Sequence, residues 1–195
     1  MGRYKFGKPN EEIELEDLQE KLAKSKLSKL KKAYIVLLYW FGYRRSEPLK
    51  LLKEDIEEKQ NVLFISVHWN RDIPFSRAKR GQAGYSMKLP LSYFGAEWVK
   101  EVWHKTRKGR NVFGFSDDTG YRAVKTIFPH KTPHWLRHNR VTKVRRQIGS
   151  VKGKDGKIVS LDDAKSFTGI KSDKTMATYG MKTEEGIDRI VDLLD

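Results

Sequence analysis

The feature that most constrains the fold is an apolar stretch at residues 28–41, which is followed directly by Gly42. Its apolar residues recur at helical spacing, at Leu30, Ala33, Tyr34, Leu37, Leu38 and Phe41. A helix this apolar is expected at the centre of a core, with other elements packed around it. Because glycine favours the backbone conformation that ends helices, we expect this helix to stop at Gly42.

Helical and β patterns follow one another around this central helix. Acidic residues and an apolar stripe predict a helix from about residue 11 through Leu22. Residues 62–67 are rich in β-formers and residues 86–91 alternate in polarity, which predicts two strands of a small antiparallel sheet. The basic segment 77–84 would form the hairpin that joins them. We therefore expect an α+β fold that is mainly helical.

Further helices are expected in the second half of the chain. They are a helix containing Tyr93, Phe94, Trp98 and Val102, a helix capped by Asp117 or Asp118 and running to about Phe128, a helix beginning at Pro133 and ending near Gly149, a helix that opens with a capping box at residues 160–163 and stops at Gly169, and a helix at residues 184–194. Residues 1–10 would be a linker or a cloning remnant. Residues 11–195 are enough for one good-sized core, and we expect them to form one domain.

The net charge narrows the class of partner. The 195 residues include 40 Lys and Arg against 25 Asp and Glu, a formal net charge of +15. Such an excess points to a polyanion, with nucleic acid the first candidate and a membrane surface the second. No apolar run approaches the roughly 20 residues of a membrane-spanning helix. The N-terminus also lacks the apolar core of a signal peptide, so we expect an intracellular, cytoplasmic protein.

The composition also limits the chemistry. The chain has no cysteine, which excludes disulfides, thiolate chemistry and Cys-based zinc sites. His134 and His138 lie four residues apart, as the ligands of a metal on a helix do. The positive charge of Arg137 between them would repel a cation, so we expect no metal site.

The most informative chemical groups lie in the basic helix expected within residues 132–146. His134 and Arg137 are three residues apart and share a helix face. A guanidinium grips two oxygens of a phosphate, while an imidazole beside it can give or take a proton. The competing interpretation is a basic helix that lies on DNA or faces solvent, with His134 only a capping residue.

Two further cationic groups precede this helix. Arg44 follows the central helix, and in a helix or tight turn the carboxylate of Glu47 would orient its guanidinium. The competing interpretation is a surface ion pair worth under about 1 kcal/mol. The tip of the hairpin, residues 77–80, would enter a DNA groove or deliver one ammonium, that of Lys79, to a leaving oxygen. The alternative for this tip is a solvated turn that only adds charge.

Taken in order along the chain, these residues resemble a known family. The matching pieces are Gly42-x-Arg44-x-x-Glu47 followed by Leu51, then Thr132-Pro-His134-x-Leu136-Arg137-His138, then Gly169 leading to Thr175 and Tyr179. In this combination and order they resemble the catalytic domain of tyrosine recombinases, the phage-integrase and Xer-like enzymes. The resemblance runs from about residue 11 to residue 180 and implies the catalytic-domain fold of that family.

The resemblance implies a mechanism for site-specific recombination or integration of DNA. Tyr179 would attack the scissile phosphorus and form a 3′-phosphotyrosine intermediate, releasing a 5′-hydroxyl. Arg44 and Arg137 would hold the non-bridging oxygens. Lys79 would donate a proton to the departing 5′-oxygen, and His134 would manage the tyrosine proton. Neither ATP nor a metal nor any other cofactor is expected.

Two departures from the family pattern stand out. Ile170 follows Gly169 at a position where the family has His or Trp, and its side chain cannot hydrogen-bond a phosphate. Either Lys171 substitutes for that residue, or the role is reduced or lost. Full-length members also carry an N-terminal helical DNA-binding domain, which nothing before residue 11 would supply. We therefore expect an excised catalytic domain or a natural minimal form, with His138 in a supporting role.

Double-stranded DNA is the expected partner, and the resemblance implies a tetramer on DNA with a monomer in isolation. Contacts would go mainly to phosphate and make the affinity salt-sensitive. The side chains expected to make them are Arg77, Arg80, Lys143, Arg145, Arg146 and the basic loop 105–110. The helix at residues 184–194 would pack on a neighbouring subunit or on its own core.

Three alternatives to a recombinase stay open at this stage. A type IB topoisomerase would use much the same residues but relax DNA without exchanging partners. A basic DNA-binding module with a degraded active site would explain Ile170. A ribosomal or RNA-binding protein would explain the charge but not the ordered set of Arg, His, Arg and Tyr.

Overall fold

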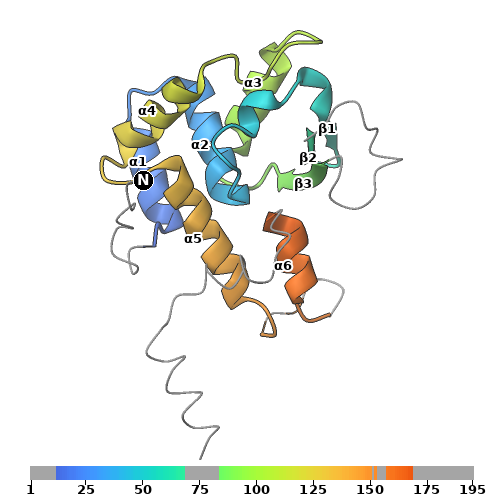
Figure 1. Ribbon diagram of the computed structural model, residues 1–195. Coiled ribbons are helices and arrows are strands. Elements are labelled where there is room, and N and C mark those ends of the chain that lie inside the picture. Colours follow the sequence, from blue (N-terminus) through green and yellow to red (C-terminus); the bar gives the residue numbers. More distant parts are fainter. Residues whose placement is uncertain (1–11, 69–83, 151, 153–156, 169–195) are drawn as a thin grey trace, which may run out of the picture.

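The apolar helix α2, Lys29–Phe41, lies at the centre of the computed structural model, which describes residues 12–68, 84–150, 152 and 157–168 (Figure 1). Eight of its 13 residues are buried. It packs against α3, Ala96–Lys105, α4, Asp117–Ile127, and α5, Pro133–Arg146. The predicted central helix is therefore confirmed. It ends as predicted at Gly42, whose N–H donates to the Leu38 carbonyl at 2.9 Å.

A small antiparallel sheet flanks the helices, as predicted, but it has three strands rather than two. The strands β1, Ile56–Lys59, β2, Val62–His68, and β3, Gly84–Pro90, pair in that order. In β2 the residues alternate between buried and partly exposed. The strand β1 escaped the sequence analysis because only Ile56 of its four residues is buried, so its polarity does not alternate. Pairing with β2 gives it the strand conformation.

Three helix starts differ from the prediction. The first helix, α1, Leu15–Lys24, begins four residues later than expected. Helix α3 begins at Ala96, so Tyr93 and Phe94 precede it and pack beside α2 instead. The cap of α4 is neither Asp117 nor Asp118 but Ser116, whose hydroxyl accepts the N–H of Thr119 at 3.2 Å. Asp117 is engaged elsewhere, in an ion pair with Arg45.

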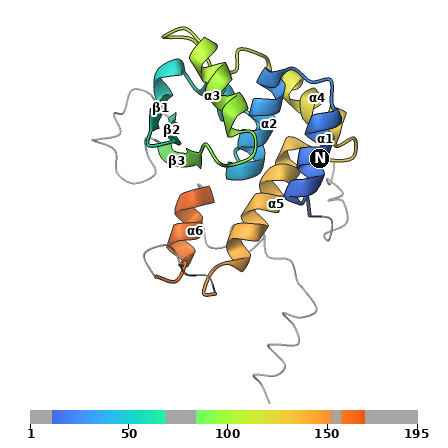
Figure 2. The same ribbon diagram turned by 180° about the vertical axis from the view of Figure 1, so that it is seen from behind.

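The helix at the end of the described chain lies below the main body, beside the second half of α5 (Figures 1 and 2). This helix, α6, Leu161–Thr168, opens with the predicted capping box. The Ser160 hydroxyl accepts from the Asp163 N–H at 3.1 Å, and the Asp163 carboxylate accepts from the Ser160 N–H at 2.9 Å. The predicted stop at Gly169 and the predicted helix 184–194 lie outside the described residues.

Two short 3₁₀ turns, η1, Pro48–Lys50, and η2, Lys53–Asp55, connect α2 to the sheet. Most buried apolar side chains form one core around α2, while Val141, Val144 and Ala164 form a second, smaller cluster between α5 and α6. In the part of the chain that the structure describes, no helix is both long enough and apolar enough to cross a membrane.

Candidate active site

The turn after α2 presents Arg44 on a buried acidic support. The Glu47 carboxylate accepts two bonds from the same residue, from the Arg44 backbone N–H at 2.6 Å and from the Arg44 guanidinium at 2.9 Å. The side chain of Glu47 is 8% exposed, whereas that of Arg44 is 54% exposed. The carboxylate is thus fixed within the fold and orients a guanidinium that reaches solvent, as the sequence predicted.

Arg137 joins this turn from the opposite direction. It lies in the first half of α5 and is only 3% exposed. Its Nη1 donates to the backbone carbonyl of Gly42 at 2.6 Å, across 95 residues of sequence. Because Gly42 lies two residues before Arg44, this bond brings both predicted phosphate-binding arginines to one corner of the molecule. We call the Arg44 turn, Gly42 and Arg137 together the arginine corner.

Gly42 is required at this corner for two reasons. Its φ of +62° lies in the left-handed region, where a side chain is strained. A Cβ added there would also lie 3.1 Å from the Arg140 Cβ and 3.6 Å from the Arg137 carbonyl oxygen. The absence of a side chain therefore lets the end of α2 approach the backbone of α5 closely enough for the Arg137 bond.

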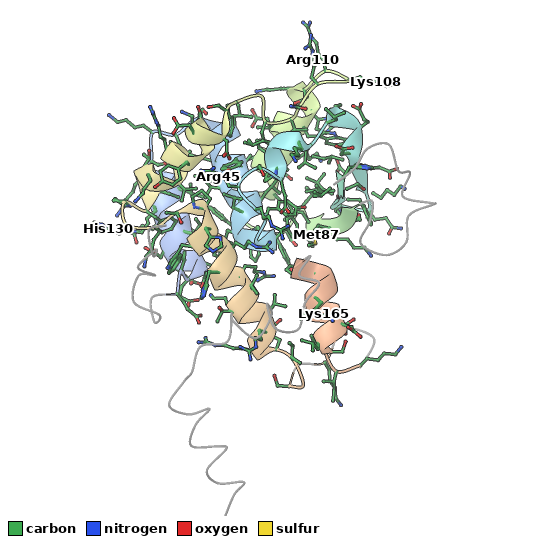
Figure 3. The ribbon with its side chains drawn as sticks, in the orientation of Figure 1. Arg45, Met87, Lys108, Arg110, His130 and Lys165 are labelled. Atoms are coloured by element: carbon green, nitrogen blue, oxygen red, sulfur yellow. The ribbon has the colours of Figure 1, made fainter. Side chains whose placement is uncertain are left out.

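The Arg44 turn has a further support that the sequence did not suggest. The buried hydroxyl of Tyr34 donates to the Arg45 carbonyl at 2.8 Å, and the Arg45 guanidinium pairs with Asp117 at the start of α4. Figure 3 labels Arg45 near the middle of the face shown, close to α4. A Cβ on Gly120 would lie 2.8 Å from that hydroxyl, so the glycine makes room for it. The apolar stripe of the sequence does not predict this support, because a helical pattern does not reveal where a hydroxyl points.

His134 and His138 lie on the same helix as Arg137, in its first two turns. Burial lowers the pKa of His134 below the usual 6.5, and the neighbouring positive charge of Arg137 lowers it further. Burial likewise lowers the pKa of His138, helped by His134. Both imidazoles are therefore neutral at pH 7. A neutral imidazole can accept a proton, which is the role the sequence suggested for His134.

Thr132 is the capping residue of α5, not His134. Its hydroxyl accepts the Trp135 N–H at 3.3 Å, and Pro133 occupies the first helical position as predicted. This leaves the His134 side chain at the surface of the helix, where it reaches solvent although the protein covers part of it. The alternative in which His134 serves only as a cap is thereby excluded.

The sequence offers other tyrosines that could take the place of Tyr179, at positions 34, 39, 43, 85, 93 and 121. The structure disfavours three of them. Burial raises the pKa of Tyr34, Tyr39 and Tyr43, so each resists forming a phenolate. The hydroxyl of Tyr34 is in addition committed to the Arg45 carbonyl. None of these three side chains presents an available phenol.

Two of the predicted DNA-binding side chains have acidic partners within the chain. Lys143 pairs with Glu14 at 2.9 Å and also donates to the Ile13 carbonyl, while Arg146 pairs with Glu12. These contacts fasten the segment before α1 to the second half of α5. Contact of Lys143, Arg145 and Arg146 with phosphate stays a prediction, and for the first and third it would compete with these carboxylates.

The basic loop after α3 lies at the other end of the molecule. Figure 3 shows Lys108 and Arg110 projecting from this loop, at the end opposite to Lys165 on α6. The backbone N–H of Gly109 donates to Glu54 at 3.1 Å, which holds the loop against η2. The predicted basic surface is therefore divided between two ends of the fold.

The remaining predicted site residues lie outside the described residues. They are Lys79, Tyr179, Lys171, Arg77 and Arg80, together with Ile170. The structure thus brings together Arg44, Glu47 and Arg137, with His134 and His138 on the helix of Arg137. Among the described residues, no three His, Asp or Glu side chains are grouped so as to hold a metal ion.

Comparison with solved structures places this geometry in a known fold. The XerH site-specific recombinase bound to its difH substrate is similar, with a TM-score of 0.63 and 18% identity over 93% of this chain. The XerA recombinase gives 0.59 and 14% over 93% of this chain, and the Tn1549 transposon integrase in complex with circular intermediate DNA gives 0.57 and 16% over 95%. The fold of this chain is therefore that of tyrosine recombinase catalytic domains, as the sequence predicted.

This chain corresponds to only part of the length of each of these structures. This chain spans 52% of the XerH chain, 64% of the XerA chain and 66% of the Tn1549 integrase chain. The sequence itself matches no family model and no curated protein.

Proposed function

We propose that this chain is the catalytic domain of a tyrosine recombinase or integrase, a DNA strand transferase that cleaves and rejoins double-stranded DNA. The observation that carries the proposal is the arginine corner, where Arg137 donates to the Gly42 carbonyl and Arg44 rests on Glu47. The recombinase fold alone shows a similar architecture and does not by itself indicate the same reaction. The corner adds charged groups suited to a phosphate.

In the proposed reaction the phenol oxygen of Tyr179 forms a bond to the scissile phosphorus while the bond from phosphorus to the 5′-oxygen breaks. The products are a 3′-phosphotyrosine and a free 5′-hydroxyl. Attack of a 5′-hydroxyl from another strand on the phosphotyrosine reverses these steps and rejoins the DNA. The phosphodiester bond is exchanged rather than hydrolysed, so the reaction needs no ATP.

The described side chains have distinct roles in this reaction. Arg44 is exposed enough to reach a non-bridging oxygen, and Arg137 is a fixed positive charge beside it. Such preorganised charge stabilises the pentacoordinate transition state without rearranging as it forms. The lowered pKa of His134 keeps its imidazole neutral and ready to take the phenol proton at pH 7. In the proposal Lys79 protonates the departing 5′-oxygen.

Assembly belongs to the same proposal. Since the chain spans only about half to two thirds of the similar structures, we propose residues 11–195 as a catalytic domain that acts together with further DNA-binding parts. Four copies would meet on two duplexes, and Arg77, Arg80 and the other basic side chains would contact phosphate.

The proposal is tested by trapping the covalent intermediate. The substrates are nicked duplexes of random sequence, which lose the short strand after cleavage and so cannot be rejoined. Protein-linked DNA that survives denaturation is counted on a gel and sequenced, which also identifies the target site. We expect an adduct with the unaltered chain, none with Tyr179→Phe, and an undiminished adduct with Tyr121→Phe, the same change on the outer helix α4.

Other outcomes would favour the alternative functions. Relaxation of supercoiled DNA without strand exchange would favour a type IB topoisomerase. Salt-sensitive DNA binding with no adduct from the whole random pool would favour a DNA-binding module with a degraded site.

A further inference from the structure

We propose that Arg140 is a positioning residue that holds α6 against the arginine corner. The chain passes from the end of α6 into the segment that contains Tyr179. Arg140 would thus set where that segment begins relative to Arg137. The catalytic consequence rests on the proposed function, whereas the placement of α6 can be measured without it.

The Arg140 guanidinium lies between aromatic rings from two other helices. It is 6.0 Å from the ring centroid of Trp40 on α2 and 5.3 Å from that of Phe167 on α6. Both distances lie within the range of cation–π attraction. Trp40 is itself held in place, because its ring packs against Tyr93 at 4.6 Å and its indole N–H donates to the Phe94 carbonyl at 3.1 Å. One side chain of α5 therefore connects α6 to a fixed point on α2.

Helix α6 has few other attachments among the described residues. It is eight residues long, and a helix of that length is marginal unless packing holds it. Ala164 is buried against Val141 and Val144 in the small second cluster. Phe167 packs against this cluster and also against the main core. The ring that Arg140 contacts therefore links α6 to the main core as well as to the small cluster.

Arg140 also contacts the arginine corner directly. It lies three residues after Arg137 on α5, and its Cβ and Cγ are the atoms nearest to where a Gly42 side chain would be. The Gly42 carbonyl is the acceptor of the Arg137 bond. Any shift of the Arg140 backbone would therefore disturb the corner and α6 together.

Burying a charged guanidinium between these rings costs desolvation free energy, which indicates that its charge contributes to the contact. Its Nε is buried and has no hydrogen-bond partner in the described part of the chain. Burial lowers the pKa of Arg140, while Tyr39 and Tyr93 oppose that shift. Methionine or leucine would fill a similar volume without a charge to desolvate. A planar guanidinium adds direction, because it is attracted most strongly when it faces a ring.

The placement of α6 can be measured by spin labels, since the chain has no cysteine of its own. Cysteines at Thr126 on α4 and Asp162 on α6 put labels at two exposed sites on opposite sides of the contact. We expect a narrow distribution of label distances in this background. Arg140→Met should broaden it, and Phe167→Leu should do the same. Arg122→Met, which removes an arginine from the surface of α4, should leave it unchanged.

The conservative variant separates positioning from simple packing. Phe167→Tyr keeps the ring and should retain the narrow distribution, while Arg140→Lys keeps the charge but not the planar group and should give an intermediate width. A narrow distribution in Arg140→Met overturns the proposal, whatever the activity of that variant.

The catalytic consequence is read from the covalent adduct at saturating DNA. Arg140→Met should slow adduct formation by roughly tenfold to a hundredfold, the size of effect expected when a reacting group is misplaced by about an ångström. The DNA affinity should stay within about twofold of the unaltered chain, because Arg140 is not itself among the side chains proposed to contact phosphate and the basic surface is kept. A broadened distance distribution with an unchanged adduct rate would overturn the link to catalysis. If the unaltered chain formed no adduct, the proposed function would fail, and the distance distributions alone would decide the role of Arg140.

Discussion

The two halves of α5 are held in different ways. In the first half, Leu136 belongs to the main core and Arg137 is bonded to the end of α2. In the second half, Val141 and Val144 form a small cluster with Ala164 of α6, and Ile148 and Phe167 pack against it. The first half therefore shares the stability of the whole core, whereas the second half depends on α6, on Arg140 and on the ion pairs of Lys143 and Arg146 with the segment before α1.

This difference separates two tasks that the proposed reaction needs. The two arginines that we propose as phosphate ligands are already held by Glu47 and Gly42 without DNA, and stabilising a transition-state charge requires such preorganised groups. The segment containing Tyr179 begins at the end of the less strongly attached helix. Substitutions in the first half should therefore alter phosphate chemistry and stability together. Substitutions in the second half should alter placement with less effect on stability.

The largest expected effect comes from Arg137→Ala, which removes the bond between the first half of α5 and the end of α2. It removes a fixed charge from the phosphate site and leaves the Gly42 carbonyl without this donor. We expect adduct formation to fall by roughly 100- to 1,000-fold and the free energy of unfolding to fall by about 1–3 kcal/mol. Single-turnover cleavage and urea unfolding measure the two effects. Arg122→Ala on the surface of α4 is the control, and an unchanged cleavage rate in Arg137→Ala would exclude it as a phosphate ligand.

Gly42→Ala should weaken both halves at once. The left-handed backbone costs a non-glycine residue about 1–2 kcal/mol, and the 3.1 Å approach to the Arg140 Cβ adds the cost of moving α5. Gly109→Ala is a matched control, because its φ is +74° but nothing lies within 4 Å of an added Cβ. Urea unfolding of the two variants should show the larger loss for Gly42→Ala. Equal losses would mean that the close approach of α2 and α5 contributes nothing.

The end of α2 and the Arg44 turn, which lie beside the first half of α5, were largely predictable from sequence. Apolar periodicity located α2, glycine marked its end, and the spacing of Arg44 from Glu47 predicted their contact, because each of these signals is local. The contact of Arg137 with Gly42 spans 95 residues, and only the resemblance to a family suggested that the two arginines meet.

The second half was less predictable. The sequence analysis gave Arg140 no role, because its surroundings depend on Trp40 and Phe167, which come from helices distant in sequence. The ion pairs of Lys143 and Arg146 were not predicted for the same reason, since sequence does not show that Glu12 and Glu14 lie beside them. Contact of these two side chains with DNA stays a prediction. A pattern along the sequence does not reveal which side chains from distant elements lie in contact.

Glu47→Gln tests whether the orientation of Arg44 contributes to the proposed reaction at the arginine corner, beside the first half of α5. The amide keeps the shape but loses the negative charge that supports two bonds. We expect adduct formation to fall by about tenfold, since hydrogen bonds to charged groups are worth roughly 1.5–3 kcal/mol. The free energy of unfolding should fall by under about 1 kcal/mol, because Arg44 is more than half exposed and its ion pair is screened by solvent. Glu101→Gln removes two surface ion pairs, with Lys29 and Lys105, and should leave the rate of adduct formation unchanged. A stability loss without a change in rate would make Glu47 a structural residue only.

The smallest expected effect is a pH dependence that belongs to the first half of α5 alone. The pKa values of His134 and His138 are lowered in the folded protein, so the unfolded chain binds protons first as the pH falls. Stability contributed by the neutral imidazoles is therefore complete above the unfolded pKa of about 6.5 and is lost as the pH falls toward the lowered values. Glu20 and Glu101 have pKa values below the usual 4.5. Their contributions to stability are therefore lost at a lower pH than those of His134 and His138. Urea unfolding at pH 7.5 and at pH 5.5 should show a loss that disappears in His134→Gln/His138→Gln. If the loss persisted in the double variant, the proton uptake would lie elsewhere. The imidazoles beside Arg137 would then not be held neutral by their surroundings.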